Sequence, residues 1–172
     1  LEQHGINPDS RIAIYTGSMV DRYHLPEIGN ASERLPDWEF VFIGKDRGAD
    51  INTIVSDRSN AHFLGSFDYD LVPGFLAHAD LGLCLIDAEQ PLKLKEFTAA
   101  GLPTLVIPAM GRWYDYDNLI FTEPKPDAIV SEIDNIGEKS VTAHSTITNE
   151  GELESWTDIS RSYLRLFENI LK

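Results

Sequence analysis

The chain has 172 residues, of which 42% are hydrophobic, and its 28 acidic against 14 basic side chains give a formal net charge of -14. That length allows one well-buried core and is too short for two ordinary domains. The negative charge disfavours nucleic acid and anionic membrane surfaces as partners, because no basic cluster offsets it. The excess, rich in Asp and poor in Lys, is typical either of a high-salt cytoplasm or of an ordinary acidic outer face.

A single cysteine, Cys84, lies inside the apolar run LGLCLI, so we expect a buried thiol and no internal disulfide framework. No apolar run approaches the about 20 residues of a membrane-spanning helix, and no secretion signal opens the chain. These features favour a cytoplasmic protein without direct membrane insertion. Residues 1–10 are polar and rich in turn formers, which predicts a linker from a missing N-terminal domain, followed by one domain over residues 11–172.

Short apolar runs alternate with segments of helical spacing, which is the pattern of a parallel sheet covered by helices on both faces. We therefore expect an α/β, Rossmann-like three-layer sandwich with a central, mostly parallel sheet of about six strands. The expected strands are 11–17, 38–45, 61–65, 80–86, 103–107 and 118–121, and the expected helical segments are 24–35, 54–60, 69–79, 91–101, 127–136 and about 155–171.

Small residues follow two of the expected strands. Gly17 and Ser18 come after the first strand, and Gly65, Ser66 and Phe67 come after the third. Ligands of open α/β sheets collect at the carboxyl ends of the strands, so these loops are candidates for a binding site. Ordinary tight turns use the same glycines, and this alternative stays open.

The expected helix at 91–101 carries a lysine, Lys93, in its first turn, with Pro91 at the first helical position. A helix N-terminus attracts anions through its free N–H groups and its dipole, so a cation there adds to an anion site. Glu96 lies on the same helical face, whereas Lys95 points away. The pattern suits a phosphate followed by a polyhydroxy group. An exposed ion pair between Lys93 and Glu96 is the structural alternative.

The segment PLKLKEFTAAGLP resembles one found in many GT-B glycosyltransferases, in the half that binds the nucleotide sugar. Four further stretches resemble other segments of that half in order and spacing: IYTGSMVDRYHLPEI, LPDWEFVFIG, NAHFLGSFDYDLVPGFLAHADLGLCLI and ESWTDIS. The resemblance covers nearly the whole chain and is to the large retaining group 1, or family 4, glycosyltransferases. It implies a C-terminal domain that binds a nucleoside diphosphate sugar as substrate, without metal or cofactor, beside its own N-terminal acceptor-binding domain.

The resemblance also implies roles for individual residues. In that family, the lysine three positions before the glutamate binds the donor diphosphate, and the glutamate binds the ribose hydroxyls. By the resemblance, these two residues correspond to Lys93 and Glu96. The loop after the first strand is implied at the donor phosphates, and the loop after the third near the nucleobase. The implied donor-site residues are Lys93, Glu96, Gly17, Ser18, Arg22, Gly65, Ser66, Phe67, Glu89 and Leu92.

Two positions depart from the family pattern. Retaining members often carry two glutamates separated by seven residues, and the first of these positions holds Ala88 here, with Glu89 one place later. Members also often pair an arginine with a lysine after the first glycine loop. Only Arg22 is available here, and it is expected to make a second diphosphate contact. By the resemblance the enzyme is a retaining hexosyltransferase, and this chain alone is expected to transfer no sugar.

Other classes fit the sequence less well. A dinucleotide oxidoreductase domain is disfavoured because YTGSMVD lacks the G-x-G-x-x-G pattern, and a phosphorelay receiver because no acidic pair follows the first strand. His62 alternates with apolar neighbours and is expected to be structural, and no residues have the spacing of metal ligands. A degenerate, noncatalytic GT-B-like domain that acts as a binding or interaction module stays open.

Overall fold

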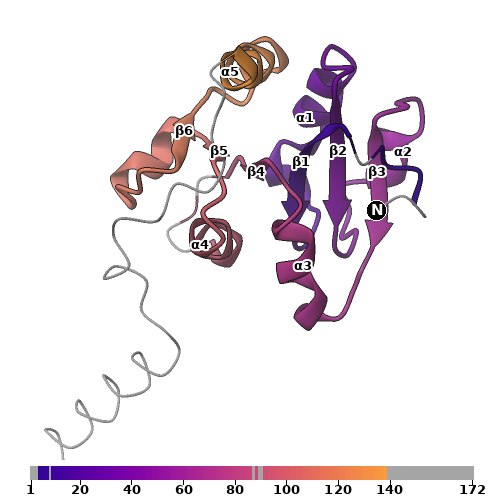
Figure 1. Cartoon of the computed structure of the whole chain (residues 1–172), viewed down its shortest axis with the longest axis horizontal. Coiled ribbons are helices and arrows are strands. Elements are labelled where there is room, and N and C mark those ends of the chain that lie inside the picture. Colours follow the sequence, from indigo (N-terminus) through magenta and orange to yellow (C-terminus); the bar gives the residue numbers. More distant parts are fainter. Residues whose placement is uncertain (1–3, 8, 87, 89–90, 139–172) are drawn as a thin grey trace, which may run out of the picture.

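Six strands form a parallel sheet in the order β3-β2-β1-β4-β5-β6 (Figure 1). The computed structural model describes residues 4–7, 9–86, 88 and 91–138. Each expected strand is confirmed, and every pairing is parallel. The order is that of the Rossmann fold, in which the chain changes direction across the sheet at the neighbouring strands β1 and β4. The strands are β1 (Arg11–Thr16), β2 (Trp38–Ile43), β3 (Ala61–Gly65), β4 (Leu81–Cys84), β5 (Thr104–Val106) and β6 (Leu119–Phe121).

The helices connect these strands largely as expected. The α-helices are α1 (Leu25–Ser32), α2 (Ile51–Val55), α3 (Val72–Leu76), α4 (Leu92–Ala99) and α5 (Pro126–Glu138), with short 3-10 segments η2 (Asp21–Tyr23), η3 (Tyr69–Leu71) and η4 (Pro108–Arg112).

Some expected helix boundaries were wrong. The helix expected at 24–35 starts after His24, whose left-handed backbone (φ 54°) precedes the first turn. In place of the helical turn expected at 54–60, the structure has α2 at Ile51–Val55. Pro91 is not the first helical residue, because its extended backbone (ψ 114°) makes it the N-cap of α4. The helix expected at about 155–171 lies outside the described residues.

Helices cover both faces of the sheet. α1 contacts both α2 and α5, whereas α4 packs against β4 and β5. The chain crosses the sheet in one direction from β1 to β2 and in the other from β4 to β5. Because such crossovers are right-handed, α1 and α4 lie on opposite faces. The sheet is therefore the middle layer of three.

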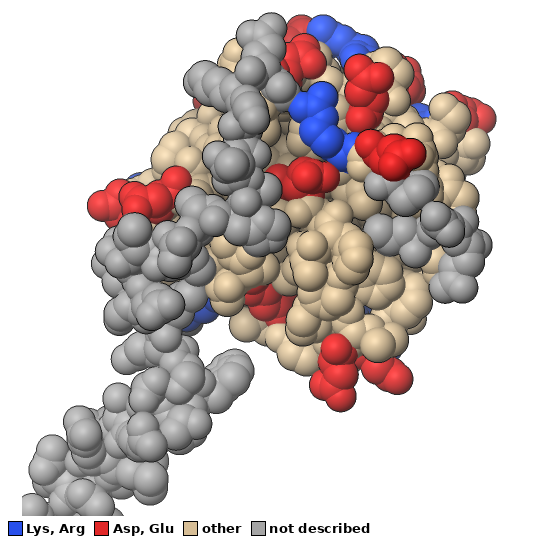
Figure 2. All heavy atoms as spheres, viewed as in Figure 1, with Lys and Arg blue, Asp and Glu red and all other residues tan. Residues whose placement is uncertain are grey.

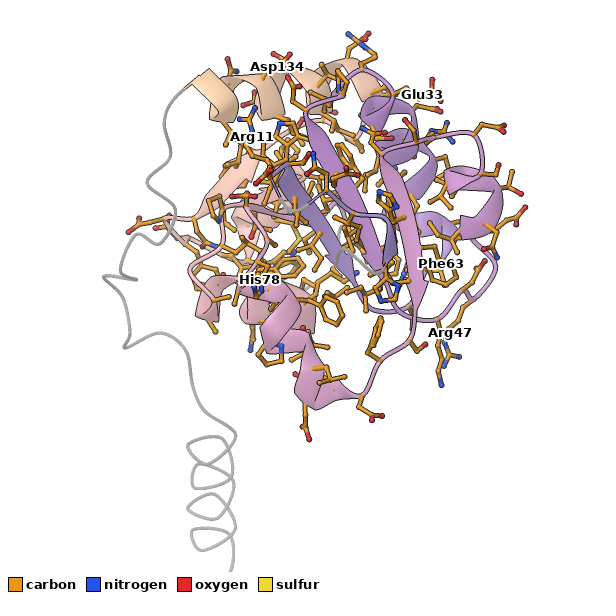
Figure 3. All side chains as sticks on the ribbon, turned by 45° about the vertical axis from the view of Figure 1, so that its right-hand side comes forward. Arg11, Glu33, Arg47, Phe63, His78 and Asp134 are labelled. Carbon is orange, nitrogen blue, oxygen red and sulfur yellow. The ribbon has the colours of Figure 1, made fainter. Side chains whose placement is uncertain are left out.

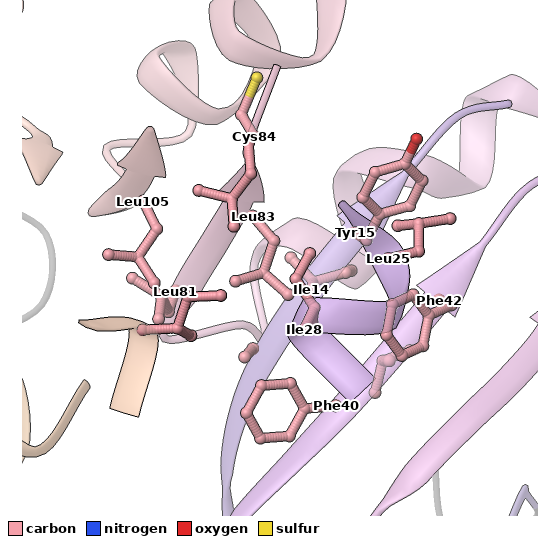
Figure 4. Close-up of a cluster of buried hydrophobic side chains, with 14 of the residues drawn as sticks. Ile14, Tyr15, Leu25, Ile28, Phe40, Phe42, Leu81, Leu83, Cys84 and Leu105 are labelled. Atoms are coloured by element: carbon pink, nitrogen blue, oxygen red, sulfur yellow. The ribbon is translucent and has the colours of Figure 1, made fainter. Parts of the chain in front are cut away.

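The core forms where the central strands are buried on both faces. Residues Ala13–Tyr15 of β1 and Phe40–Phe42 of β2 are each at most 1% exposed, which explains why both strands read as continuous apolar runs. Figure 4 shows side chains of β1, β2, β4 and β5 with Leu25 and Ile28 of α1 in this cluster. Cys84 is fully buried, as expected, and burial raises the pKa of its thiol to about 11.

Because the strands are parallel, their amino ends lie together at one end of the sheet and their carboxyl ends at the other. Figure 3 shows Arg11, at the start of β1, and Arg47, in the loop after β2, at opposite ends of the strands. The carboxyl end, marked by Arg47, is where the loops after β1, β2 and β3 meet.

Figure 2 shows acidic side chains spread over several parts of one face, where the Lys and Arg side chains form no extended basic patch.

Candidate functional site

A pocket of about 400 Å³ opens at the carboxyl end of the sheet. The loops after β1, β2 and β3 form one wall, and the first turn of α4 with η3 forms the other. Open α/β sheets bind ligands at this position, and the volume is in the range of small-molecule sites. The lining residues are Thr16, Gly17, Ser18, Tyr23, Ile43, Gly44, Lys45, Ser66, Phe67, Tyr69, Val72, Pro91, Leu92, Lys93 and Glu96.

Main-chain hydrogen bonds tie the three loops of the first wall together. The N–H of Gly17 donates to the carbonyl oxygen of Ile43 at 2.9 Å, and the N–H of Gly44 donates to that of Gly65 at 2.8 Å. A Cβ added to Gly44 would lie 1.8 Å from the carbonyl oxygen of Gly17. The backbone at Gly44 also has a φ of +144°, which favours glycine. This wall therefore has its shape from main chain in close contact.

Tyr15 joins this framework to the charged part of the pocket. It is fully buried, and its hydroxyl donates to the carbonyl oxygen of Ser18 at 2.6 Å. Burial, with the neighbouring Tyr23, holds the pKa of Tyr15 well above its usual value, so the hydroxyl stays a donor. The ring lies under the ammonium group of Lys93, 3.7 Å from the ring centroid to Nζ.

Lys93 is buried in the first turn of α4, with 8% of its surface exposed. Its Nζ lies over Tyr15 and, 4.0 Å from the centroid, over Tyr23, and the faces of both rings attract a cation. Nζ has no hydrogen-bond partner among the described residues. Burial lowers the pKa of Lys93 to about 7. The exposed ion pair with Glu96, the structural alternative, is therefore wrong, because this lysine is not on the surface.

Close packing of α4 on the sheet explains how a lysine becomes buried there. A Cβ added to Gly82 of β4 would lie 2.5 Å from the ring of Phe97, so the helix rests where the strand has no side chain. Lys93 is one turn before Phe97 in α4 and is carried inward with it. The same approach places the ammonium group against Tyr15.

Buried polar atoms without partners gather in this pocket. In the described part of the chain, the buried side-chain atoms without a hydrogen-bond partner are Lys93 Nζ, Thr16 Oγ1 and Arg58 Nε. The first two belong to residues that line the pocket, and the guanidinium group of Arg58 is bonded through its other nitrogens. Since buried polar groups are almost always paired, two such atoms in one pocket indicate where a polar ligand supplies the partners.

Glu96, one helical turn after Lys93, reaches the mouth of the same pocket. Its Oε1 accepts a hydrogen bond from the hydroxyl of Tyr69 in η3. This bond, followed by partial burial, raises the pKa of Tyr69 to about 12. The hydrogen bond joins the short helical segment after β3 to α4.

The structure brings most of the sequence-predicted site residues together. Gly65 is outside the lining, although its carbonyl oxygen holds Gly44. Arg22 is exposed, outside the lining, and lies over the ring of Tyr23 at 5.4 Å. Glu89 falls outside the described residues. The predicted residues that line the pocket are Gly17, Ser18, Ser66, Phe67, Leu92, Lys93 and Glu96.

The sequence did not predict several residues of this site, among them Tyr15, Thr16, Tyr23 and Tyr69, and Gly44 and Lys45 of the loop after β2. Tyr15 and Thr16 directly precede Gly17 at the carboxyl end of β1, and that position is a signal that would have found them. Tyr23 and Tyr69 carry no comparable signal, because each belongs to a short 3-10 segment without periodicity. They enter the site only through tertiary contacts with Lys93 and Glu96.

His62 has the structural role expected for it. Its Nε2 lies 2.6 Å from Oε2 of Glu39 on the neighbouring strand. Within the described ranges, no group of three or more His, Cys, Asp or Glu side chains is placed to hold a metal ion. Among these same residues, no helix has both the length and the apolar character needed to cross a membrane.

The sequence matches no protein-family model and no curated protein. The structure, however, is similar to solved structures. Sucrose-phosphate synthase from Thermosynechococcus elongatus matches with a TM-score of 0.81 at 17% identity, over 99% of this chain and 48% of that one. The C-terminal domain of a glycosyl transferase group 1 family protein, LpcC from Francisella tularensis, matches with a TM-score of 0.64 at 20% identity, over 81% of this chain and 80% of that one.

A third match is Anabaena HepE, whose structure is a complex with UDP and glucose. It has a TM-score of 0.61 at 16% identity, over 80% of this chain and 41% of that one. The chain spans about half the length of the sucrose-phosphate synthase and 80% of the LpcC domain. It therefore has the fold of the GT-B domains of group 1 glycosyltransferases, as its sequence segments suggested.

Proposed function

We propose that the chain is the donor half of a GT-B glycosyltransferase. It binds a nucleoside diphosphate sugar, and the sugar passes to an acceptor held by an N-terminal acceptor-binding domain. The observation that carries this proposal is the buried ammonium group of Lys93, which has no hydrogen-bond acceptor among the described residues and lines a pocket at the carboxyl end of the sheet.

A diphosphate suits this ammonium group and the hydrogen-bond donors around it. Several phosphate oxygens can accept from Lys93, from the hydroxyl of Thr16 and from the free N–H groups that open α4. A nearby anion also favours the charged lysine and raises its pKa from the low value that burial imposes. The diphosphate gains charge as the sugar leaves, so a preorganised cation beside it stabilises the transition state.

The remaining lining residues fit the other parts of such a donor. Glu96, one turn beyond Lys93, accepts hydrogen bonds from the ribose hydroxyls. Ser66 and Phe67 lie on the nucleobase side, while Gly17 and Ser18 approach the phosphates through main chain. Arg22 and Gly65, outside the lining, act at longer range, with Arg22 as a second cation for the diphosphate. By the sequence resemblance Glu89 belongs to the sugar side, and Leu92 is a further lining residue of the donor site.

The reaction class rests on the same resemblance. The chain would belong to a retaining enzyme of hexosyltransferase type, with no metal ion at the diphosphate. We assign no catalytic residue, because the acceptor side of the cleft would come from the other domain. For the same reason, the chain by itself is expected to bind donor without transferring sugar.

Calorimetric titration of the chain tests the proposal without any acceptor. Uridine, guanosine and adenosine diphosphates are titrated in the absence of divalent metal, and the tightest is used for the variants. Lys93→Ala should weaken binding by about 1.5 to 3 kcal/mol, or about ten- to a hundredfold, because a charge-assisted hydrogen bond is lost. The matched control is Lys95→Ala, which removes a charge from the same helix outside the pocket.

Equal losses for the two lysine variants would mean generic charge attraction and would contradict the proposal, as would no binding of any nucleotide. Tight binding by the chain, combined with an absence of transfer in the presence of the other domain, would instead favour the noncatalytic binding module.

A further inference from the structure

Tyr69 is the most exposed large hydrophobic residue among the described ones, at 64%, yet its hydroxyl is engaged. It lies in η3, reaches across the mouth of the pocket, and donates to Oε1 of Glu96 in α4. The pKa of the phenol, raised to about 12 mainly by this hydrogen bond, keeps the hydroxyl protonated and donating. A side chain that is tethered at its tip and exposed along its ring is poised to contact a ligand.

The tether acts first on Glu96. A glutamate near the surface samples several rotamers, and a ligand that needs one of them bears the entropy of ordering it. The bond from Tyr69 occupies Oε1 and fixes the plane of the carboxylate before any ligand arrives. Oε2 is then left for a donor from the pocket, because a carboxylate can accept from several donors at once.

The ring of Tyr69 acts second, as a cover. Leu92, at the start of α4, also lines the pocket and is 51% exposed. Two large apolar surfaces are thus held at the mouth of a pocket whose inner part carries Lys93. A sugar ring against these two side chains would lie beside Glu96, which bonds to Tyr69 and follows Leu92 by one helical turn.

We infer that Tyr69 is a positioning residue that sets the sugar specificity of the nucleotide: it orients Glu96 toward the ribose hydroxyls and makes the site prefer ribonucleotides over 2′-deoxyribonucleotides. This inference rests on the proposed function, since it presumes that the pocket takes a nucleoside diphosphate. It adds a residue outside the lysine and glutamate segment to the recognition of the sugar.

The test compares the ribo and 2′-deoxyribo forms of uridine, guanosine and adenosine diphosphate by calorimetry, on the whole chain. With the base that binds best, the wild type should prefer the ribo form. Tyr69→Phe keeps the ring and removes the donor, so it should lower the ribo-to-deoxyribo affinity ratio about three- to tenfold, the value of one hydrogen bond. The deoxyribo form should lose less affinity than the ribo form, because it presents only its 3′-hydroxyl to Glu96.

Two further variants separate positioning from structure. Tyr69→Ala also removes the ring, and it should weaken both forms in addition to lowering the ratio. Leu71→Ala changes an exposed residue, 53% exposed, of the same short segment outside the pocket lining, and it should leave the ratio unchanged. Melting temperatures of all variants should match the wild type, since both side chains are on the surface.

The outcomes that contradict the inference differ from those that contradict the proposed function. Nucleotide binding with the same ratio in wild type and Tyr69→Phe would overturn the inference alone, and so would equal losses for both sugar forms. A wild type that binds none of the nucleotides would overturn the proposed function and the inference with it.

Discussion

The two walls of the pocket are built on opposite principles. In the loops after β1, β2 and β3, main-chain groups of neighbouring loops bond to each other. At the first turn of α4, the buried amine of Lys93 has aromatic faces under it but no acceptor among the described residues. A buried polar group without a partner costs stability. The main-chain groups of the loops already bond to each other, whereas the side-chain atoms Lys93 Nζ and, at the end of β1, Thr16 Oγ1 have no partner among the described residues.

The largest effect on stability is expected in the loops after β1, β2 and β3, whose main-chain groups bond to each other. Gly44→Ala would place a Cβ 1.8 Å from the carbonyl oxygen of Gly17, so the loops after β1 and β2 must separate. We expect a loss of at least about 3 kcal/mol in the free energy of unfolding. Urea denaturation followed by circular dichroism measures it.

Gly48→Ala is the matched control for this prediction. Gly48 also has a positive φ, +107°, but no atom lies within 4 Å of an added Cβ. Its replacement should cost only the backbone strain, about 1 to 2 kcal/mol. Equal losses at the two positions would mean that strain, rather than the contact between loops, explains both glycines.

The folded chain should become more stable when Lys93, in the second wall, is replaced by an uncharged side chain. The pKa of Lys93 is about 7 in the folded chain against 10.5 as the ordinary value. Between these values the unfolded chain binds a proton that the folded chain lacks, so the free energy of unfolding rises with pH. Lys93→Met should therefore be more stable than the wild type at pH 7, and this gain should shrink by about 1 kcal/mol per pH unit.

Denaturant midpoints between pH 7 and 8.5 test this prediction. At higher pH the raised pKa values of Cys84 and Tyr15 would make the free energy of unfolding fall as pH rises, which is the opposite effect. Lys95→Met serves as the control, because it removes a lysine from the same helix outside the pocket. A gain for Lys93→Met that does not vary with pH would contradict the lowered pKa of Lys93.

The smallest effect on stability is expected for His62 and Glu39, which already bond to each other. His62 and Glu39 bond at 2.6 Å, with side chains 15% and 12% exposed. Glu39→Gln keeps the size and loses the charge, so we expect a loss of about 1 kcal/mol in the free energy of unfolding. Nucleotide titration should be unchanged. A weaker affinity in this variant would show that the pair affects the pocket although neither residue lines it.

Sequence reasoning reached the fold because apolar runs and breaks between them specify a parallel sheet locally. It also placed Lys93 in the first turn of a helix, since periodicity and proline define that turn. It could not give the burial of this lysine, which depends on the approach of α4 to Gly82. The bond between Tyr69 and Glu96 escaped it as well, because it joins residues 27 positions apart in segments of no shared pattern.

The main-chain wall has a consequence for how such a domain changes over evolutionary time. A surface held by N–H and carbonyl groups constrains the few positions at which a Cβ would collide, such as Gly44, and leaves most others free to drift. Two chains can then share one fold although their amino-acid sequences differ at most positions. This chain and the sucrose-phosphate synthase share one fold, with a TM-score of 0.81, at 17% identity.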